Sequence, residues 1–208
     1  MGNDLKFGGL IKTTKKILVV SDLHVGSNVA IMPDEVYIEP SDKQREQRIE
    51  SNPLQKVIFK EWCDMIDTAG KVDACFYLGD GVEGSNRKGR GFELWTPNIH
   101  QQVSTAADLL SMIKTNKYFG VQGSYYHVGE NTSSDLAVME SLSRCRTEFG
   151  TDLAVNVEES RFHLAHVISP TSSPVSRLTA SNKEILAAEG NIDFYNVLNF
   201  FHRKQIPS

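Results

Sequence analysis

Residues 16–24 read KILVVSDLH, and this stretch decides the fold. Its apolar half is short and rich in β-branched side chains, and such a run predicts a strand that is buried on both faces. The strand leads directly into Asp22 and His24, two side chains of the types that bind metals or transfer protons. The same arrangement recurs in ACFYLGD at residues 74–80, where a second buried strand leads into Asp80.

Predicted helices alternate with predicted strands along the rest of the chain. The first helix begins at Pro53, repeats apolar residues every three or four positions and stops at Gly70, which is typical of an amphipathic helix. Residues 26–50 are polar, and we expect a long irregular surface segment there. The other predicted elements are helices at residues 99–113, 135–144 and 175–188, and strands at residues 118–122, 153–158, 161–168 and 194–200.

This alternation indicates an α/β protein. The two adjacent strands at residues 153–158 and 161–168 indicate a mixed rather than a purely parallel sheet. A length of 208 residues fits one domain better than two.

Composition excludes several classes of protein. Apolar residues make up 40% of the chain, which is too many for a disordered or fibrous protein. No apolar run approaches the ~18 residues of a membrane span, and the first residues lack the hydrophobic segment of a secretory signal. A net charge of −4 argues against a broad basic nucleic-acid footprint. Three cysteines, an odd number, favour a reducing compartment, so we expect a cytoplasmic protein without membrane contact.

Side chains that can bind metals lie near or just beyond the ends of five of the six predicted strands. In open α/β sheets, ligands bind beyond the carboxyl ends of the strands. One such side chain alone is more simply explained as a turn cap or a satisfied polar residue, but five together indicate a site. Mixed carboxylate and imidazole ligands suit Mn, Fe or Zn better than Ca or Mg. The strand ends carry Asp22 with His24, Asp80 with Glu83, Ser124 to His127, His166, and His202.

These motifs resemble the calcineurin-like metallophosphoesterases. The D-x-H at residues 22–24 and the G-D-x-x-E at residues 79–83 match the first two motifs of that family. His166 matches the later single histidine after a strand, and F-H-R-K at residues 201–204 takes the place of the final G-H-x-H. The resemblance implies an αββα sandwich of mixed sheets flanked by helices, in a single domain over residues 1–208. It also implies that the C-terminal part of the family domain is missing, leaving the second sheet incomplete.

The resemblance also implies a role for each matching residue. It implies two divalent metal ions, with Mn²⁺ expected and Fe, Zn or Mg as alternatives. It places Asp80 between the two ions as the bridging carboxylate. His127 would stand near the leaving group as an acid or electrostatic partner, which makes His127 and Asp80 the catalytic residues. The implied metal ligands are Asp22, His24, Asp80, Ser124, His166 and His202.

Two positions depart from the family pattern. The family's G-N-H-[DE] reads GSYYH at residues 123–127, so Ser124 replaces the metal-binding Asn. Either its hydroxyl serves as a weaker ligand or a water molecule takes the position. Phage-type members of the family look similar at this point, and a phage protein would work in the host cytoplasm. The second histidine of G-H-x-H is replaced by Lys204. A lysine is protonated at its ordinary pKa near 10.4 and cannot bind a metal, so we expect weak binding at the first site.

Two further features bear on the site. His163 and His166 lie three residues apart on one predicted strand and so face opposite sides, which makes His163 a bystander. A basic segment follows Asp80, with Phe92 and Trp95 just beyond it, and this composition suits a nucleotide or a nucleic-acid strand. The alternative is a solvated loop with one buried aromatic residue. The expected substrate-binding residues of this segment are Arg87, Lys88 and Arg90.

We therefore expect a dinuclear-metal-dependent phosphoesterase that hydrolyses a phosphodiester by metal-activated water, with DNA and RNA among its candidate substrates. The alternative is a degenerate member of the family, weak or inactive in catalysis, that binds phosphate, a nucleotide or a protein partner. A nucleotide-binding fold of the P-loop kind is excluded, because the chain contains no G-x-x-x-x-G-K-[ST]. The sequence leaves the oligomeric state open.

Overall fold

The central element of the fold is a parallel four-stranded sheet. A computed structural model describes residues 3–5, 15–38, 47–85, 91–124 and 134–166. Within these residues the strand order is β2-β5-β6-β7, and every neighbouring pair is parallel. The four strands are β2 (Ile17–Val20), β5 (Ala74–Tyr77), β6 (Lys117–Val121) and β7 (Arg146–Gly150).

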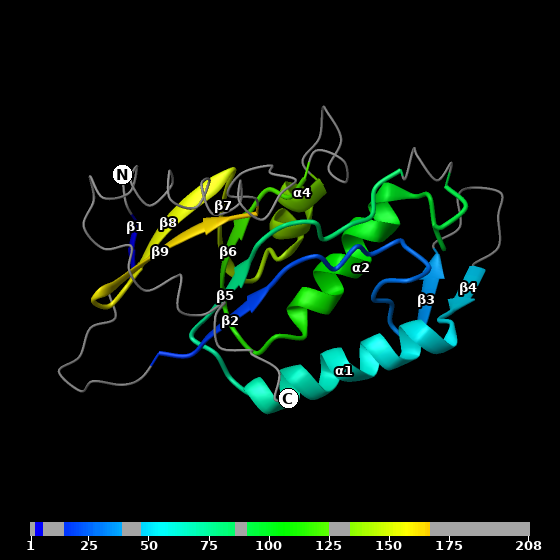
Figure 1. Cartoon of the computed structure of the whole chain (residues 1–208), viewed down its shortest axis with the longest axis horizontal. Coiled ribbons are helices and arrows are strands. Elements are labelled where there is room, and N and C mark those ends of the chain that lie inside the picture. The colour runs from blue at the N-terminus through cyan, green and yellow to red at the C-terminus, as the bar shows by residue number, and fades with distance from the viewer. Residues whose placement is uncertain (1–2, 6–14, 39–46, 86–90, 125–133, 167–208) are drawn as a thin grey trace, which may run out of the picture.

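The helices cover one face of this sheet (Figure 1). They are α1 (Pro53–Ala69), α2 (Ile99–Ser111) and α4 (Ser134–Ser141). Cys75 and Tyr77 of β5 point toward them and pack in one cluster with Trp62 of α1 and Leu110 of α2. No helix among the described residues is long and apolar enough to cross a membrane.

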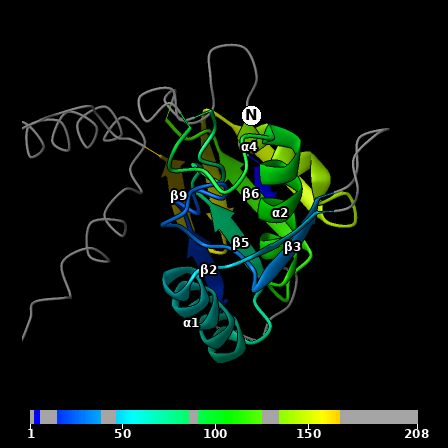
Figure 2. The ribbon, with the colours of Figure 1, turned by 90° about the vertical axis from the view of Figure 1, so that its right-hand side faces the viewer.

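A second sheet covers the opposite face. Its strand order is β1-β8-β9, with β1 parallel to β8 and β8 antiparallel to β9. The three strands are β1 (Asn3–Leu5), β8 (Asp152–Val157) and β9 (Ser160–Ala165). Phe76 and Phe119 of the parallel sheet pack against Val155 and Leu164 of this second sheet. Figure 2 shows α2 and β9 on opposite sides of β5.

The described residues thus form three layers: helices, a parallel sheet and a mixed sheet. The α/β class is therefore confirmed. The predicted helix at residues 175–188 and strand at residues 194–200 lie outside the described residues.

The local signals of α1 explain why this helix is well predicted. The side chain of Asn52 accepts a hydrogen bond from the N–H of Gln55, and the Gln55 side chain accepts one from the N–H of Asn52. This reciprocal pair satisfies two donors that a helix start otherwise leaves without partners. Pro53 follows at the first helical position, and Gly70 ends the helix with a positive φ of 61°.

The prediction of an irregular segment at residues 26–50 is wrong, because that segment contains a hairpin. Strand β3 (Glu35–Ile38) pairs with β4 (Gln47–Glu50) in an antiparallel sheet. The register sets Glu35 opposite Glu50, and Arg48 forms ion pairs with both carboxylates. Cross-strand charge pairs stabilise such a ribbon without a clear apolar alternation, so periodicity does not reveal it.

The region after residue 134 also differs from the prediction. The helix α4 ends at Ser141, where residues 135–144 were expected to be helical, and β7 was not predicted at all. Strand β7 is a sheet edge with the sequence RTEFG, and its residues are exposed or half-buried. This segment is a strand because it pairs with β6, so the apolar pattern of its own sequence does not predict it.

Phe76 is expected to be the most sensitive position between the two sheets. It is 1% exposed, and its ring lies 5.8 Å from that of Phe119 and 5.6 Å from that of Phe162, centroid to centroid. Phe76→Ala should lower the free energy of unfolding by about 3–5 kcal/mol, measured by urea denaturation. Phe92→Ala, at a side chain that is 85% exposed, serves as the control and should change it by less than about 0.5 kcal/mol. Equal effects of the two changes would contradict this packing.

Candidate metal centre

The segments that follow β2 and β5 run side by side past the ends of the strands. The N–H of Asp22 donates to the carbonyl of Gly79 at 3.0 Å, and the N–H of His24 donates to the carbonyl of Asp80 at 3.0 Å. The N–H of Val25 then donates to the carbonyl of Gly81, also at 3.0 Å. These main-chain bonds continue the pairing of the two strands and bring the D-x-H and G-D-x-x-E motifs together.

The backbone is strained at this point. Asp22, His24 and Asp80 have φ values of 56°, 46° and 53°, in the left-handed region that side chains other than glycine seldom adopt. Among the described residues only one further non-glycine residue, Glu158 in the turn between β8 and β9, has a positive φ. Such conformations cost about 1–3 kcal/mol each and collect at functional sites. Their position here indicates a site of function.

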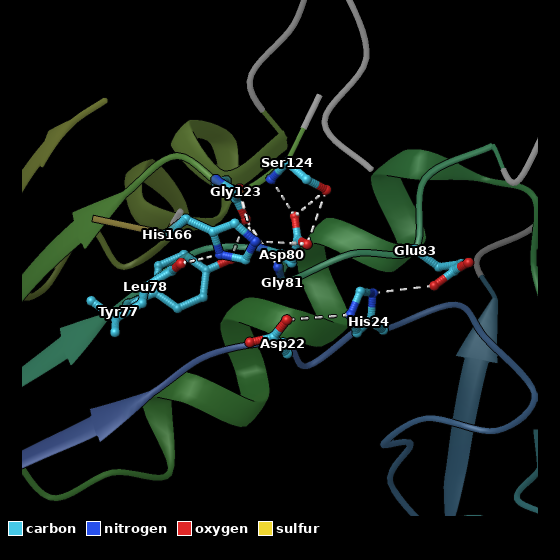
Figure 3. A network of polar contacts seen from close by, with 11 residues as sticks. Asp22, His24, Tyr77, Leu78, Asp80, Gly81, Glu83, Gly123, Ser124 and His166 are labelled. Carbon is cyan, nitrogen blue, oxygen red and sulfur yellow. Dashed lines mark hydrogen bonds and ion pairs between the residues drawn. The ribbon is translucent and has the colours of Figure 1, made fainter. Parts of the chain in front are cut away.

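Asp22, His24 and Asp80 form a cluster of candidate ligands. One ligand atom from each lies within 4.8 Å of the other two, and Nε2 of His24 is 3.6 Å from Oδ1 of Asp22. On the other side of the ring, Nδ1 of His24 lies 3.2 Å from Oε2 of Glu83, as an ion-pair contact (Figure 3). A carboxylate beside Nδ1 favours the proton on that nitrogen and leaves the lone pair of Nε2 directed at the cluster.

Ser124 holds the carboxylate of Asp80 from the end of β6. The N–H of Ser124 donates to Oδ1 of Asp80 at 2.7 Å, and its hydroxyl lies 3.2 Å from Oδ1 and 3.0 Å from Oδ2. Asp80 is only 4% exposed. A buried carboxylate with these donors is held in one orientation.

His166, just after β9, approaches Asp80 from the second sheet. Its Nδ1 lies 2.7 Å from the carbonyl oxygen of Leu78, and its Nε2 lies 3.1 Å from Oδ2 of Asp80 (Figure 3). A carbonyl oxygen only accepts, so Nδ1 carries the proton. The contact between Nε2 and the carboxylate then needs either a proton between these two atoms or a cation bound to both.

His163 points away from this site, as the alternation along a strand predicts. It pairs across the second sheet with Ala154, and its Nε2 lies 3.6 Å from Oδ1 of Asp152. Its neighbour Phe162 packs in the core between the sheets. The prediction that the two histidines face opposite sides is confirmed.

Asp135, in the first turn of α4, is a member of the site that the sequence did not indicate. It is 0% exposed and accepts hydrogen bonds from the N–H groups of Asp80 at 3.3 Å, Gly81 at 3.0 Å and Gly123 at 2.8 Å. The Tyr77 hydroxyl donates to it as well. Burial and the Asp135 carboxylate raise the pKa of Tyr77 well above its ordinary value, so the hydroxyl keeps its proton. An Asp at a helix start is equally typical of a cap, which explains why sequence did not single it out.

Five of the predicted site residues are thus brought to one place, at the carboxyl ends of β2, β5 and β6 and beside the end of β9. They are Asp22, His24, Asp80, Ser124 and His166. The remaining ones, His127, His202, Arg87, Lys88 and Arg90, lie outside the described residues, as does Lys204.

Comparison with known proteins gives no family: no protein-family model matches the chain, and no curated protein matches it.

Proposed function

We propose that this protein is a metal-dependent phosphoesterase of the calcineurin-like metallophosphoesterase type, acting on a phosphodiester. The observation that carries the proposal is the position of Asp80. On one side its carboxylate belongs to the cluster with Asp22 and His24, and on the other it contacts Ser124 and His166. One carboxylate shared by two ligand groups is the arrangement expected of a centre that holds two ions.

The residues present fit such ions. Asp22, His24 and Asp80 would hold the first, and Asp80, His166 and Ser124 would hold the second. Both histidines have an oxygen beside Nδ1, namely Oε2 of Glu83 for His24 and the carbonyl of Leu78 for His166. This is the usual arrangement around metal-binding histidines, because it orients the ring and directs Nε2 at the ion. Mixed oxygen and nitrogen ligands favour Mn²⁺, with Fe, Zn and Mg as the alternatives.

The residues of this chain would orient the bound ions and leave one side of the site open to a substrate. Two divalent ions bound here would polarise the phosphoryl oxygens and lower the pKa of a water molecule. The Asp80 side chain is 5% exposed and forms the floor of the site, whereas that of Asp22 is 54% exposed. A phosphodiester, including one in DNA or RNA, would therefore approach from the side of Asp22.

The second candidate function is binding without turnover, in which the site holds phosphate, a nucleotide or a protein partner. The contact between His166 and Asp80 favours it, because a doubly protonated imidazole would satisfy the same 3.1 Å distance as a plain ion pair. Such a site needs no metal at this position. The two candidates therefore differ in whether divalent ions bind.

A titration with Mn²⁺ separates them. The purified full chain is expected to bind two Mn²⁺ ions by calorimetry, the one at Asp22 and His24 more weakly, and to hydrolyse an aryl phosphodiester only when the metal is present. His166→Gln should remove the binding of one ion, because it takes away the imidazole nitrogen beside Asp80. His163→Gln, on the same strand but facing away, is the matched control and should leave both ions bound. If the unaltered chain binds no Mn²⁺ and shows no hydrolysis, the binding function is supported and the enzyme is rejected.

A further inference from the structure

The buried carboxylate of Asp135 joins two segments that carry the candidate ligands. Its Oδ1 accepts from the N–H of Gly81, and its Oδ2 accepts from the N–H groups of Gly123 and Asp80. Gly81 and Asp80 follow β5, whereas Gly123 follows β6. The hydroxyl of Tyr77, in β5 itself, also donates to Oδ1. One side chain thus contacts the strand, the peptide groups on both sides of the Asp80 Cα atom and the start of the Ser124 segment.

Two glycines make room in this cluster, Gly81 beside the Asp135 carboxylate and Gly123 beside Asp80. A Cβ atom on Gly81 would lie 2.1 Å from the Tyr77 hydroxyl and 3.3 Å from Oδ1 of Asp135. A Cβ atom on Gly123 would lie 2.3 Å from the nitrogen of Asp80. The main chain therefore approaches Asp135 closely on two sides, and the three N–H groups converge on it because no side chain intervenes.

We propose that Asp135 is a positioning residue, which holds the Asp80 peptide in its left-handed conformation and so presets the shared carboxylate before any ion binds. The inference rests on the proposed function, in which Asp80 is the carboxylate common to both ions. Asp80 has a φ of 53°, and a residue in that region is retained only where its surroundings determine it. The N–H of Asp80 precedes the φ and ψ torsions of this residue, and the N–H of Gly81 follows them. Both N–H groups donate to Asp135, so the peptide groups on either side of these torsions are held.

Presetting matters because an ordered site binds its ligand without a further loss of conformational entropy. If the Asp80 segment moved freely, an ion would have to order it on binding. The hydrogen bonds between Ser124 and Asp80 would then also have to form at that moment. We therefore expect Asp135 to act on metal affinity through Asp80, without contacting the ions. A purely structural Asp135 would contribute to stability alone.

The test compares Asp135→Asn with Tyr77→Phe in the full chain. In Asp135→Asn the new amide would face at least one main-chain N–H with its own NH₂ group. A hydrogen bond that positions Asp80 or Gly123 is then lost. Tyr77→Phe removes only the hydroxyl and leaves all three main-chain donors in place. Both changes remove polar contacts of the same buried cluster, so both are expected to lower stability in urea. Only the first should disturb the position of Asp80.

Two measurements read the position of Asp80. The first is hydrogen exchange by NMR at the amides of Asp80, Gly81 and Gly123 in protein without metal. The second is Mn²⁺ affinity by calorimetry. Asp135→Asn should speed exchange at these amides and weaken Mn²⁺ binding by about 10–100-fold, the usual effect of a residue that supports a ligand. Tyr77→Phe should change neither.

The outcomes separate this proposal from the proposed function. Unchanged exchange and unchanged Mn²⁺ affinity in Asp135→Asn would overturn the positioning role, as would equal losses of affinity in both variants. If neither the unaltered chain nor the variants bind Mn²⁺, the proposed function fails. Faster exchange in Asp135→Asn but not in Tyr77→Phe would still show that Asp135 holds Asp80 in position. Should Asp135→Asn not fold, Asp135→Ser, which leaves room for a water molecule, replaces it. If neither folds, Asp135 is required for folding itself and the positioning role is rejected.

Discussion

Asp80→Asn should abolish the metal-dependent hydrolysis of an aryl phosphodiester, with a loss of at least about 10³-fold in kcat/KM. Asp80 is the one carboxylate shared by both candidate ion sites, and ions at such a centre contribute several kcal/mol to the stabilisation of the reaction's charge, at 1.36 kcal/mol for each factor of ten. The amide removes the negative charge that attracts both ions. The measurement is steady-state kinetics at saturating Mn²⁺, together with calorimetry of ion binding.

The variant is expected to fold normally. An Asn at this position retains an oxygen that accepts from the N–H of Ser124, and its NH₂ group donates to a neutral Nε2 of His166 in place of the present contact. Asp67→Asn is the matched control, because that carboxylate is 78% exposed on α1. It should retain full activity. Hydrolysis that survives in Asp80→Asn would show that the activity does not come from this site.

Gly123→Ala should both destabilise the protein and remove its metal binding. The added Cβ atom would lie 2.2 Å from Oδ1 and 2.3 Å from the nitrogen of Asp80. Because one of the contacting atoms is main chain, the segments after β5 and β6 have to separate. We expect the free energy of unfolding to fall by about 3 kcal/mol or more, at the upper end for overpacking. Separation also displaces the Asp80 carboxylate, so the calorimetric signal for Mn²⁺ should disappear.

Gly120→Ala, within the preceding strand β6, provides the comparison. Its added Cβ atom would lie 2.9 Å from the sulfur and the terminal methyl group of Met139, and an unbranched, flexible side chain can move aside. The expected loss of stability is about 1 kcal/mol, with Mn²⁺ binding unchanged. A Gly123→Ala protein that matches the unaltered chain in urea denaturation and in Mn²⁺ affinity would contradict the close approach of the two segments.

Elements with local signals were predicted well. The cap at Asn52, the proline that follows it and the glycine at the end predict α1 from sequence neighbours alone. Strand β5 is also predicted, because all four of its residues are apolar and buried. The β3–β4 hairpin and β7 were missed for the opposite reason. Neither element has a clear apolar pattern of its own. The hairpin is stabilised by Arg48, which pairs with two glutamates, and β7 is a strand because it pairs with β6.

Sequence patterns were sufficient to predict the α/β class, the placement of Asp22, His24 and Asp80 after predicted strands, and that of His166 near the end of one. This was possible because the carboxyl ends of parallel strands meet at one edge of a sheet, so that order along the chain predicts nearness in space. The tertiary structure alone decided which atoms meet. Asp135 is 55 residues away from Asp80 along the chain, and His166 is 88 residues away from Leu78. Contacts across such separations depend on how helix α4 and the second sheet pack against the parallel sheet, and no pattern of neighbouring residues encodes that packing.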